Sequence, residues 1–157
     1  LPDMDTAREY GERIHHEQSR TGNSGHFYID RDGSVERWVP LDRVAHHVRD
    51  HNKDSVGIEL VNLGRWPDWH HSRHQEWEET FPDPQIHALI EMLAMLERKL
   101  PALAEIAGHD QLDHDWIEAS DTPDILVRRK TDPGPEFPWL RVLAATGLKS
   151  YREVDDH

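Results

Sequence analysis

The apolar pattern near the start of the chain predicts one helix followed by a pair of strands. Thr6-Ala7-Arg8-Glu9 is a capping-box pattern with a modest apolar stripe after it, so we expect a helix from about Thr6 to Ser19. Residues 26–30 and 34–39 are rich in aromatic and β-branched side chains, and Asp32-Gly33 joins them. This combination predicts a β-hairpin.

A third strand is predicted over residues 55–62. The segment is mostly apolar, which suggests a central position in a sheet. Side chains alternate between the two faces of a strand, so the carboxylate of Glu59 falls in an otherwise apolar setting. One face carries Val56, Ile58 and Leu60, and the other carries Gly57, Glu59 and Val61.

The rest of the chain alternates loops with amphipathic segments. A polar loop over residues 63–80 precedes the clearest helix, which we expect Asp83 to cap, Pro84 to open and Pro101 to end. The core-facing positions of this helix are predicted to be Ile86, Leu89, Ile90, Leu93 and Leu96. After it come a short strand near Ile106, an acidic loop at residues 110–124 and a last helix at residues 137–146.

These elements predict a single α/β domain over residues 1–157, with a central mixed sheet flanked by helices. The formal charge of −13 at pH 7 argues against nucleic acid as a partner, because a phosphate-binding surface needs clustered Lys and Arg. No apolar run is long enough for membrane insertion. Since the chain has no Cys, a metal would have to bind His, Asp or Glu.

His109 and Asp132 are the first candidates for chemistry. Gly108 permits a close turn before His109, and the Pro133-Gly134-Pro135 sequence stiffens the chain around Asp132. Imidazole and carboxylate are both zinc ligands, and Lys130 would share a side with Asp132 in an extended segment. An ammonium there suits an electrophilic helper in hydrolysis. The alternative is that these are ordinary polar residues of surface loops.

Glu59 is the candidate general base. A carboxylate in an apolar strand is costly unless it is solvated, paired or catalytic, and Gly57 on the same face leaves space beside it for a ligand. The alternative is a face that is open to water. His46 and His47 either line the same cleft or belong to a surface loop.

Other clusters allow competing interpretations. The His70-His71-Ser72-Arg73-His74 sequence could bind a second metal, but the Trp-rich polar loop around it favours a solvated lid. The run from His109 to Asp115 could also hold a metal by itself. Trp66 and Trp69 could stack on sugar rings or simply pack the loop.

Five ordered blocks of the chain resemble the zinc-dependent N-acetylmuramoyl-L-alanine amidases of the type-2 amidase family. That family includes muropeptide-recycling enzymes and phage lysozyme-type amidases, and it shares its fold with peptidoglycan-recognition proteins. The resemblance extends from about Thr6 to Leu140. The blocks are residues 26–33, 39–47, 55–61, 108–109 and 129–137.

The resemblance implies a role for each candidate. His109 and Asp132 would be ligands of one zinc ion, Glu59 the catalytic acidic residue, and Lys130 the residue that stabilises the oxyanion. His47 matches a histidine of the family's site. Further candidates for contacting the substrate are His46, Trp66 and Trp69. The substrate would be the amide that joins N-acetylmuramic acid to L-alanine in peptidoglycan or muropeptides.

The sequence departs from the family pattern in three places. The family's first zinc ligand is a histidine at the end of an N-terminal strand, which we expect upstream of Leu1, with His15, His16 or His47 as possible substitutes. The interval from His109 to Asp132 is longer than usual, so the loop at residues 110–124 would be an insertion at the rim of the cleft. Gly25 replaces a frequent Tyr, which favours proton transfer by Glu59.

The competing function is a module that binds muropeptide without cleaving it. The retained candidate residues favour the enzyme, whereas the first ligand's absence from residues 1–157 favours the module. A hydrolase acting on another amide is a weaker third reading. The sequence leaves open the oligomeric state, the choice between intact wall and soluble fragments, and the compartment, with the cell envelope or periplasm favoured over the cytoplasm.

Overall fold

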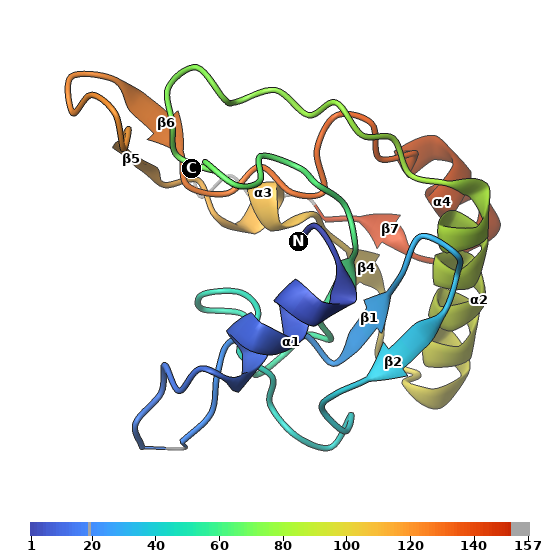
Figure 1. Ribbon diagram of the computed structural model, residues 1–157. Helices are drawn as coiled ribbons and strands as arrows, with labels where there is room; N and C mark the ends of the chain where they lie inside the picture. Colours follow the sequence, from blue (N-terminus) through green and yellow to red (C-terminus); the bar gives the residue numbers. More distant parts are fainter. Residues whose placement is uncertain (19, 152–157) are drawn as a thin grey trace, which may run out of the picture.

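The computed structural model of the protein describes residues 1–18 and 20–151. None of its described helices is long and apolar enough to cross a bilayer. In chain order the elements are α1 (Met4–Glu12), β1 (Phe27–Ile29), β2 (Val35–Arg37), β3 (Ile58–Leu60), α2 (Asp83–Lys99), β4 (Glu105–Ile106), α3 (His109–Leu112), β5 (Trp116–Glu118), β6 (Leu126–Arg128), α4 (Trp139–Ala145) and β7 (Lys149–Ser150) (Figure 1).

The main sheet has the strand order β2-β1-β3 and is mixed, as predicted. β1 and β2 form the expected antiparallel hairpin, whose turn contains Gly33 at a φ of 87°, a conformation that glycine adopts without strain. β1 and β3 are parallel, with Tyr28 opposite Glu59. The prediction that β3 is central is wrong for the described residues, because β1 occupies the middle. The apolar character of β3 reflects packing of its partly buried Ile58 and Leu60 against the hydrophobic core, not strands on both sides.

Two clusters of buried side chains cover opposite faces of this sheet. In Figure 1, α2 runs along one side of the sheet and α1 lies toward the other. The predicted alternation in β3 is confirmed, since Val56, Ile58 and Leu60 pack against the larger cluster and Val61 belongs to the smaller one. The larger cluster comprises Phe27, Ile29, Ile86, Leu89, Met92, Leu93, Leu96, Phe137, Val142 and Leu148, and the smaller one Met4, Ala7, Tyr28 and Val61.

The first helix is shorter than predicted and starts earlier. Asp3 is its N-cap, and the Asp3 side chain accepts a 2.7 Å hydrogen bond from the Thr6 amide. The helix ends at Glu12, because the Thr21 carbonyl accepts hydrogen bonds from the amides of residues 15 and 16 and draws the chain into a return turn. Ser19, the predicted end, lies outside the described residues.

The second helix confirms the predicted apolar stripe but not its cap. Pro82, in an extended conformation, is the N-cap, and Asp83 is the first helical residue, where it pairs with Arg141 instead of capping. Gln85 is fully buried in this helix, and its Nε2 donates to the carbonyls of Ile29 (3.0 Å) and Val61 (2.9 Å). One side chain of α2 therefore satisfies backbone acceptors at the ends of β1 and β3.

The second half of the chain adds two small sheets. The predicted strand near Ile106 is β4, which pairs in parallel with β7, a strand that the sequence pattern did not reveal. The prediction of a plain loop at residues 110–124 is wrong, because β5 pairs with β6 in an antiparallel hairpin that projects from the body in Figure 1. The many acidic residues obscured a short alternation in which Trp116 and Glu118 are exposed and Ile117 faces inward.

Candidate functional site

A close approach that Gly108 permits and one backbone hydrogen bond bring His109 and Asp132 together. His109 opens α3 directly after Gly108, and a Cβ on Gly108 would lie only 2.6 Å from Pro133 Cδ. The amide of Asp110 donates to the Asp132 carbonyl at 3.0 Å. The corner between β4 and α3 is therefore packed against the segment that follows β6, although the two are far apart in the sequence.

His109 and Asp132 are in direct contact. His109 Nδ1 lies 3.1 Å from Asp132 Oδ2. Burial alone would raise the pKa of Asp132, but the hydrogen bond with His109 and the positive charges of His109 and Lys130 hold that pKa at about 2. The carboxylate is thus ionised at neutral pH, which is the form that binds a metal.

Glu59 belongs to the same group of charges. Burial, followed by the negative charge of Asp132, raises the pKa of Glu59 above its usual value, while His109 and Lys130 oppose that rise. A Cβ on Gly25 would lie 3.0 Å from Glu59 Cγ, so the glycine leaves room for the carboxylate. The four residues that the sequence singled out as ligands, base and electrophile therefore influence one another electrostatically.

His47 borders this group but its ring nitrogens are already engaged. Nδ1 lies 3.0 Å from the Ala45 carbonyl and Nε2 lies 2.9 Å from Ser55 Oγ. Burial lowers the pKa of His47 to about 4, and the charge of His109 contributes in the same direction. The ring is neutral at pH 7 and occupies the space left by Gly57, which lacks a side chain.

His26 is a structural residue to which the sequence analysis gave no role. Its ring is 2% exposed, accepts the Gly57 amide at Nδ1 (3.0 Å) and donates from Nε2 to the Arg43 carbonyl (2.9 Å). It thus joins the start of β1 to the chain before β3 and to the loop that leads to His47. Its position at the head of a buried strand was the only available signal.

The other predicted substrate contacts pack against neighbouring side chains. Trp66 and Trp69 lie 5.3 Å apart between ring centroids and both contact Tyr10. His46 stacks on His16 at a centroid distance of 3.9 Å. In the structure the two tryptophans pack the loop, which agrees with that interpretation. Their contact with a sugar stays a prediction.

The histidine-rich loop is fastened to the β5–β6 hairpin and does not form a metal site. Ser72 donates from its amide (2.8 Å) and its hydroxyl (2.6 Å) to Asp121, and His71 lies 3.7 Å from the same carboxylate. Across residues 1–18 and 20–151, no three His, Asp or Glu side chains converge as a metal cluster would require. The described residues therefore give no support to the alternatives of a second metal at residues 70–74 or of one held by residues 109–115 alone.

The donor chemistry of His109 and Asp132 nevertheless suits zinc. An imidazole nitrogen and an ionised carboxylate lie within 3.1 Å of each other beside Glu59 and Lys130. Catalytic zinc sites generally have three protein ligands, and this pair has the chemistry to supply two of them.

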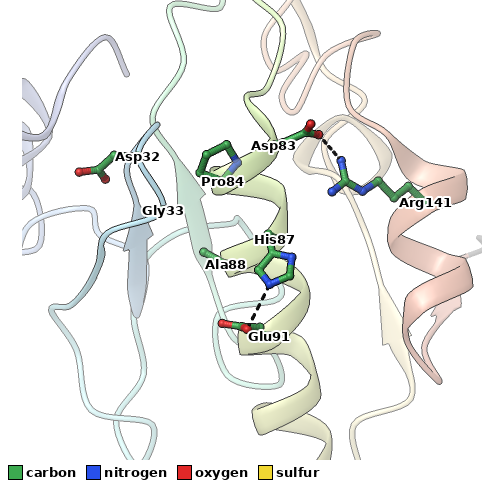
Figure 2. A pocket seen from close by; sticks show the side chains of 8 residues that line it. All are labelled: Asp32, Gly33, Asp83, Pro84, His87, Ala88, Glu91 and Arg141. Carbon is green, nitrogen blue, oxygen red and sulfur yellow. Dashed lines mark hydrogen bonds and ion pairs between the residues drawn. The ribbon is translucent and has the colours of Figure 1, made fainter.

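A shallow depression of about 500 Å³ lies elsewhere on the molecule, between the β1–β2 turn, α2 and α4 (Figure 2). Its polar side chains pair locally, His87 with Glu91 and Asp83 with Arg141. None of the candidate catalytic residues lines it. We therefore place the candidate site at His109, Asp132, Glu59 and Lys130.

Comparison with known proteins finds amidases of similar sequence. The AmpD protein of Salmonella typhimurium strain LT2, named 1,6-anhydro-N-acetylmuramyl-L-alanine amidase, is 32% identical over 140 residues, which cover 83% of this chain and 61% of that protein. The chain spans about three fifths of the length of the curated AmpD relatives that it matches.

Two solved structures share the fold at lower identity. LysC from Clostridium intestinale URNW, an N-acetylmuramoyl-L-alanine amidase, superposes with a TM-score of 0.65 at 23% identity over 95% of this chain and 80% of that one. AmiD from E. coli, in complex with anhydro-N-acetylmuramic acid-L-Ala-D-γ-Glu-L-Lys, gives 0.65 at 20% identity over 96% and 55%.

The family model described as N-acetylmuramoyl-L-alanine amidase matches residues 2–135. These residues contain all five blocks on which the resemblance was based except the last two positions of the fifth block, and they contain His109, Asp132, Glu59 and Lys130. The predicted resemblance is confirmed: the chain belongs to the N-acetylmuramoyl-L-alanine amidase family.

Proposed function

We propose that the protein hydrolyses the amide bond between N-acetylmuramic acid and L-alanine in muropeptides or peptidoglycan, with one zinc ion as cofactor. The observation that carries the proposal is the contact of His109 with Asp132 beside a carboxylate, Glu59, whose pKa is raised. Family membership supports the bond type, and the muropeptide bound by E. coli AmiD supports the substrate class.

His109 Nδ1 or Nε2 and Asp132 Oδ2 are the atoms proposed to hold the zinc. When bound, zinc supplies Lewis acidity that makes a water nucleophilic at neutral pH and polarises the scissile carbonyl. The third ligand stays predicted as a histidine upstream of Leu1. Two of the residues considered as substitutes are already engaged elsewhere, which supports this choice. Both ring nitrogens of His47 form hydrogen bonds, and the His16 ring contacts Asn23 and His46.

Glu59 is proposed to move the proton. A partly buried carboxylate beside the negative charge of Asp132 binds a proton more readily than one in water, which suits a general base. It accepts the proton that the attacking water loses and returns it to the departing nitrogen of L-alanine. One side chain, Glu59, therefore performs both proton transfers of the hydrolysis.

Lys130 is proposed to neutralise the negative charge that develops on the carbonyl oxygen. The positive charge of its ammonium lowers the pKa of both Glu59 and Asp132, so Lys130 belongs to the same group of interacting charges. One such donor typically lowers the barrier by about 3 kcal/mol. Removing it should therefore reduce kcat far more than it raises KM.

The test is to measure zinc content and peptide release from a muramoyl-tripeptide, for this chain and for one extended upstream. Cleavage that a chelator abolishes and zinc restores supports the enzyme. Cleavage by the extended chain alone would assign the third ligand to the upstream segment. Stoichiometric muropeptide binding by both chains without cleavage would refute the proposal in favour of a recognition module.

A further inference from the structure

Arg65 is a buried arginine near the start of the polar loop at residues 63–80. It is 4% exposed, and within residues 1–18 and 20–151 no carboxylate forms an ion pair with it. Burying a guanidinium without a carboxylate partner is costly unless hydrogen bonds satisfy its donors. The acceptors of its hydrogen bonds therefore indicate the structural role of Arg65.

Two of those acceptors belong to the backbone that leads into the candidate site. Arg65 Nη1 donates to the Arg128 carbonyl at 2.9 Å, and Nη2 donates to the Arg129 carbonyl at 3.1 Å. These are the last two carbonyls before Lys130. On its other side the Arg129 amide donates to the Asp115 carbonyl at 2.9 Å, so the chain is held from two directions just before the site.

The third acceptor, Gln75, makes the loop a firm support for Arg65. Arg65 Nη1 donates to Gln75 Oε1 at 2.6 Å. Gln75 Nε2 in turn lies within hydrogen-bonding distance of three carbonyls of the same loop, those of Trp69 (3.0 Å), His71 (2.8 Å) and His74 (3.2 Å). Although residues 63–80 contain no helix or strand, this pair of side chains fixes their path.

We propose that Arg65 is a positioning residue, which sets where Lys130 and Asp132 enter the site by anchoring the carbonyls of Arg128 and Arg129. The roles of Lys130 and Asp132 in this inference rest on the proposed function, whereas the anchoring rests on the contacts.

The variants Arg65→Met and Arg65→Lys distinguish the effect of the Arg65 hydrogen bonds from the effect of the volume that its side chain fills. Methionine keeps an unbranched apolar stem and removes all three hydrogen bonds, while lysine retains a charge and donors that can reach one carbonyl. Arg31→Met is the matched control. Arg31 holds the same loop through Glu79 (2.5 and 3.0 Å) and also donates to the Pro2 carbonyl, but it forms no hydrogen bond or ion pair with residues 128–132.

Amide hydrogen exchange of the metal-free chain is the first readout, because it needs neither zinc nor substrate. In Arg65→Met the amides of Asp110 and Arg129 should lose protection about tenfold, since their acceptors and neighbours are no longer held. The Val61 amide, which donates to Ile29 within the core, should keep its protection. Arg31→Met should leave all three amides protected, and Arg65→Lys should recover part of the loss.

Zinc affinity is the second readout. Arg65→Met should bind zinc about 10- to 100-fold more weakly than the unsubstituted chain, as is usual when support behind a ligand is removed, and Arg31→Met should match the unsubstituted chain. Unchanged exchange at Asp110 and Arg129, equal loss at Val61, or unchanged zinc affinity would each overturn the inference. Where only the chain extended upstream binds zinc, the same variants are compared in that chain. If neither chain binds zinc, the proposed function fails instead, and the exchange data still decide whether Arg65 anchors this backbone.

Discussion

Replacing Gly57 by alanine should push His47 out of its position beside the site. A Cβ on Gly57 would lie 2.6 Å from His47 Cδ2 and 2.9 Å from its Cβ, and nearer still to Cγ. The Gly57 backbone cannot retreat, because its amide donates to His26 Nδ1 (3.0 Å) and its carbonyl accepts the amides of His26 (2.8 Å) and Phe27 (3.2 Å). The imidazole must therefore move.

The cost can be worked from the contacts that the ring would lose. His47 gives up its hydrogen bonds with Ala45 and Ser55, each worth about 0.5–1.5 kcal/mol. Overpacking a filled site adds about 1–3 kcal/mol, and the lower chain entropy of alanine in the unfolded state returns about 0.4–1 kcal/mol. The free energy of unfolding should fall by about 1–5 kcal/mol.

Urea unfolding followed by circular dichroism measures this change. Gly147→Ala is the control, because its added Cβ would meet only the end of the flexible Glu97 side chain at 2.8 Å, so its effect should stay within about 0.5 kcal/mol. In the double variant Gly57→Ala, His47→Ala the ring is gone and the clash with it. The combined loss should then be at least 1 kcal/mol smaller than the sum of the two single losses, and simple additivity would refute the steric account.

Three other predictions concern the core, pH and the site. Gln85→Leu should lower the free energy of unfolding by about 2–4 kcal/mol, because the carbonyls of Ile29 and Val61 each lose a buried hydrogen bond, although the Ile29 carbonyl still accepts the Val61 amide; an unchanged thermal midpoint would contradict this. The pKa of His47 is about 4 in the folded protein against 6.5 unfolded, so the unfolded chain binds the extra proton first. Stability is full above pH 6.5 and should fall by about 2–3 kcal/mol as the pH drops to 4, with His47→Ala flattening that dependence in urea titrations. Asp132→Asn should lose zinc in metal analysis, whereas Glu59→Gln should keep zinc and lose turnover; the reverse pattern would exchange their roles.

The parts of the fold that depend on short-range pattern were predictable. The β1–β2 hairpin follows from Asp32-Gly33 between alternating strands, and α2 follows from its helical periodicity. Boundaries were less predictable where a tertiary contact decided them, as at the end of α1, where the Thr21 carbonyl takes the following amides. The position of β3 at the edge was missed because burial by helices and burial by strands leave the same apolar signature.

The candidate site was only partly predictable. Residue chemistry singled out Glu59, His109 and Asp132 and suggested their roles, and the family resemblance implied the same roles. Their meeting was not predictable from local pattern, because it depends on contacts such as that of the Asp110 amide with the Asp132 carbonyl. Arg65 was missed, since an arginine in a polar loop gives no sign in the sequence that it is buried. A side chain that hydrogen-bonds to backbone far away in the sequence produces no periodic pattern from which its contact could be predicted.

The β5–β6 hairpin leaves the body at α3 and returns beside it. Arg128 donates to the carbonyls of Asp110 and Asp113, and Arg129 pairs with Asp113, so the two ends of the excursion are tied together. Once the ends of a loop are fixed, doubling its length costs only about 0.6 kcal/mol of closure entropy. The hairpin is therefore an interchangeable part: evolution or an engineer can lengthen, trim or replace its outer end while His109 and Asp132, one on either side of it, keep their relative position.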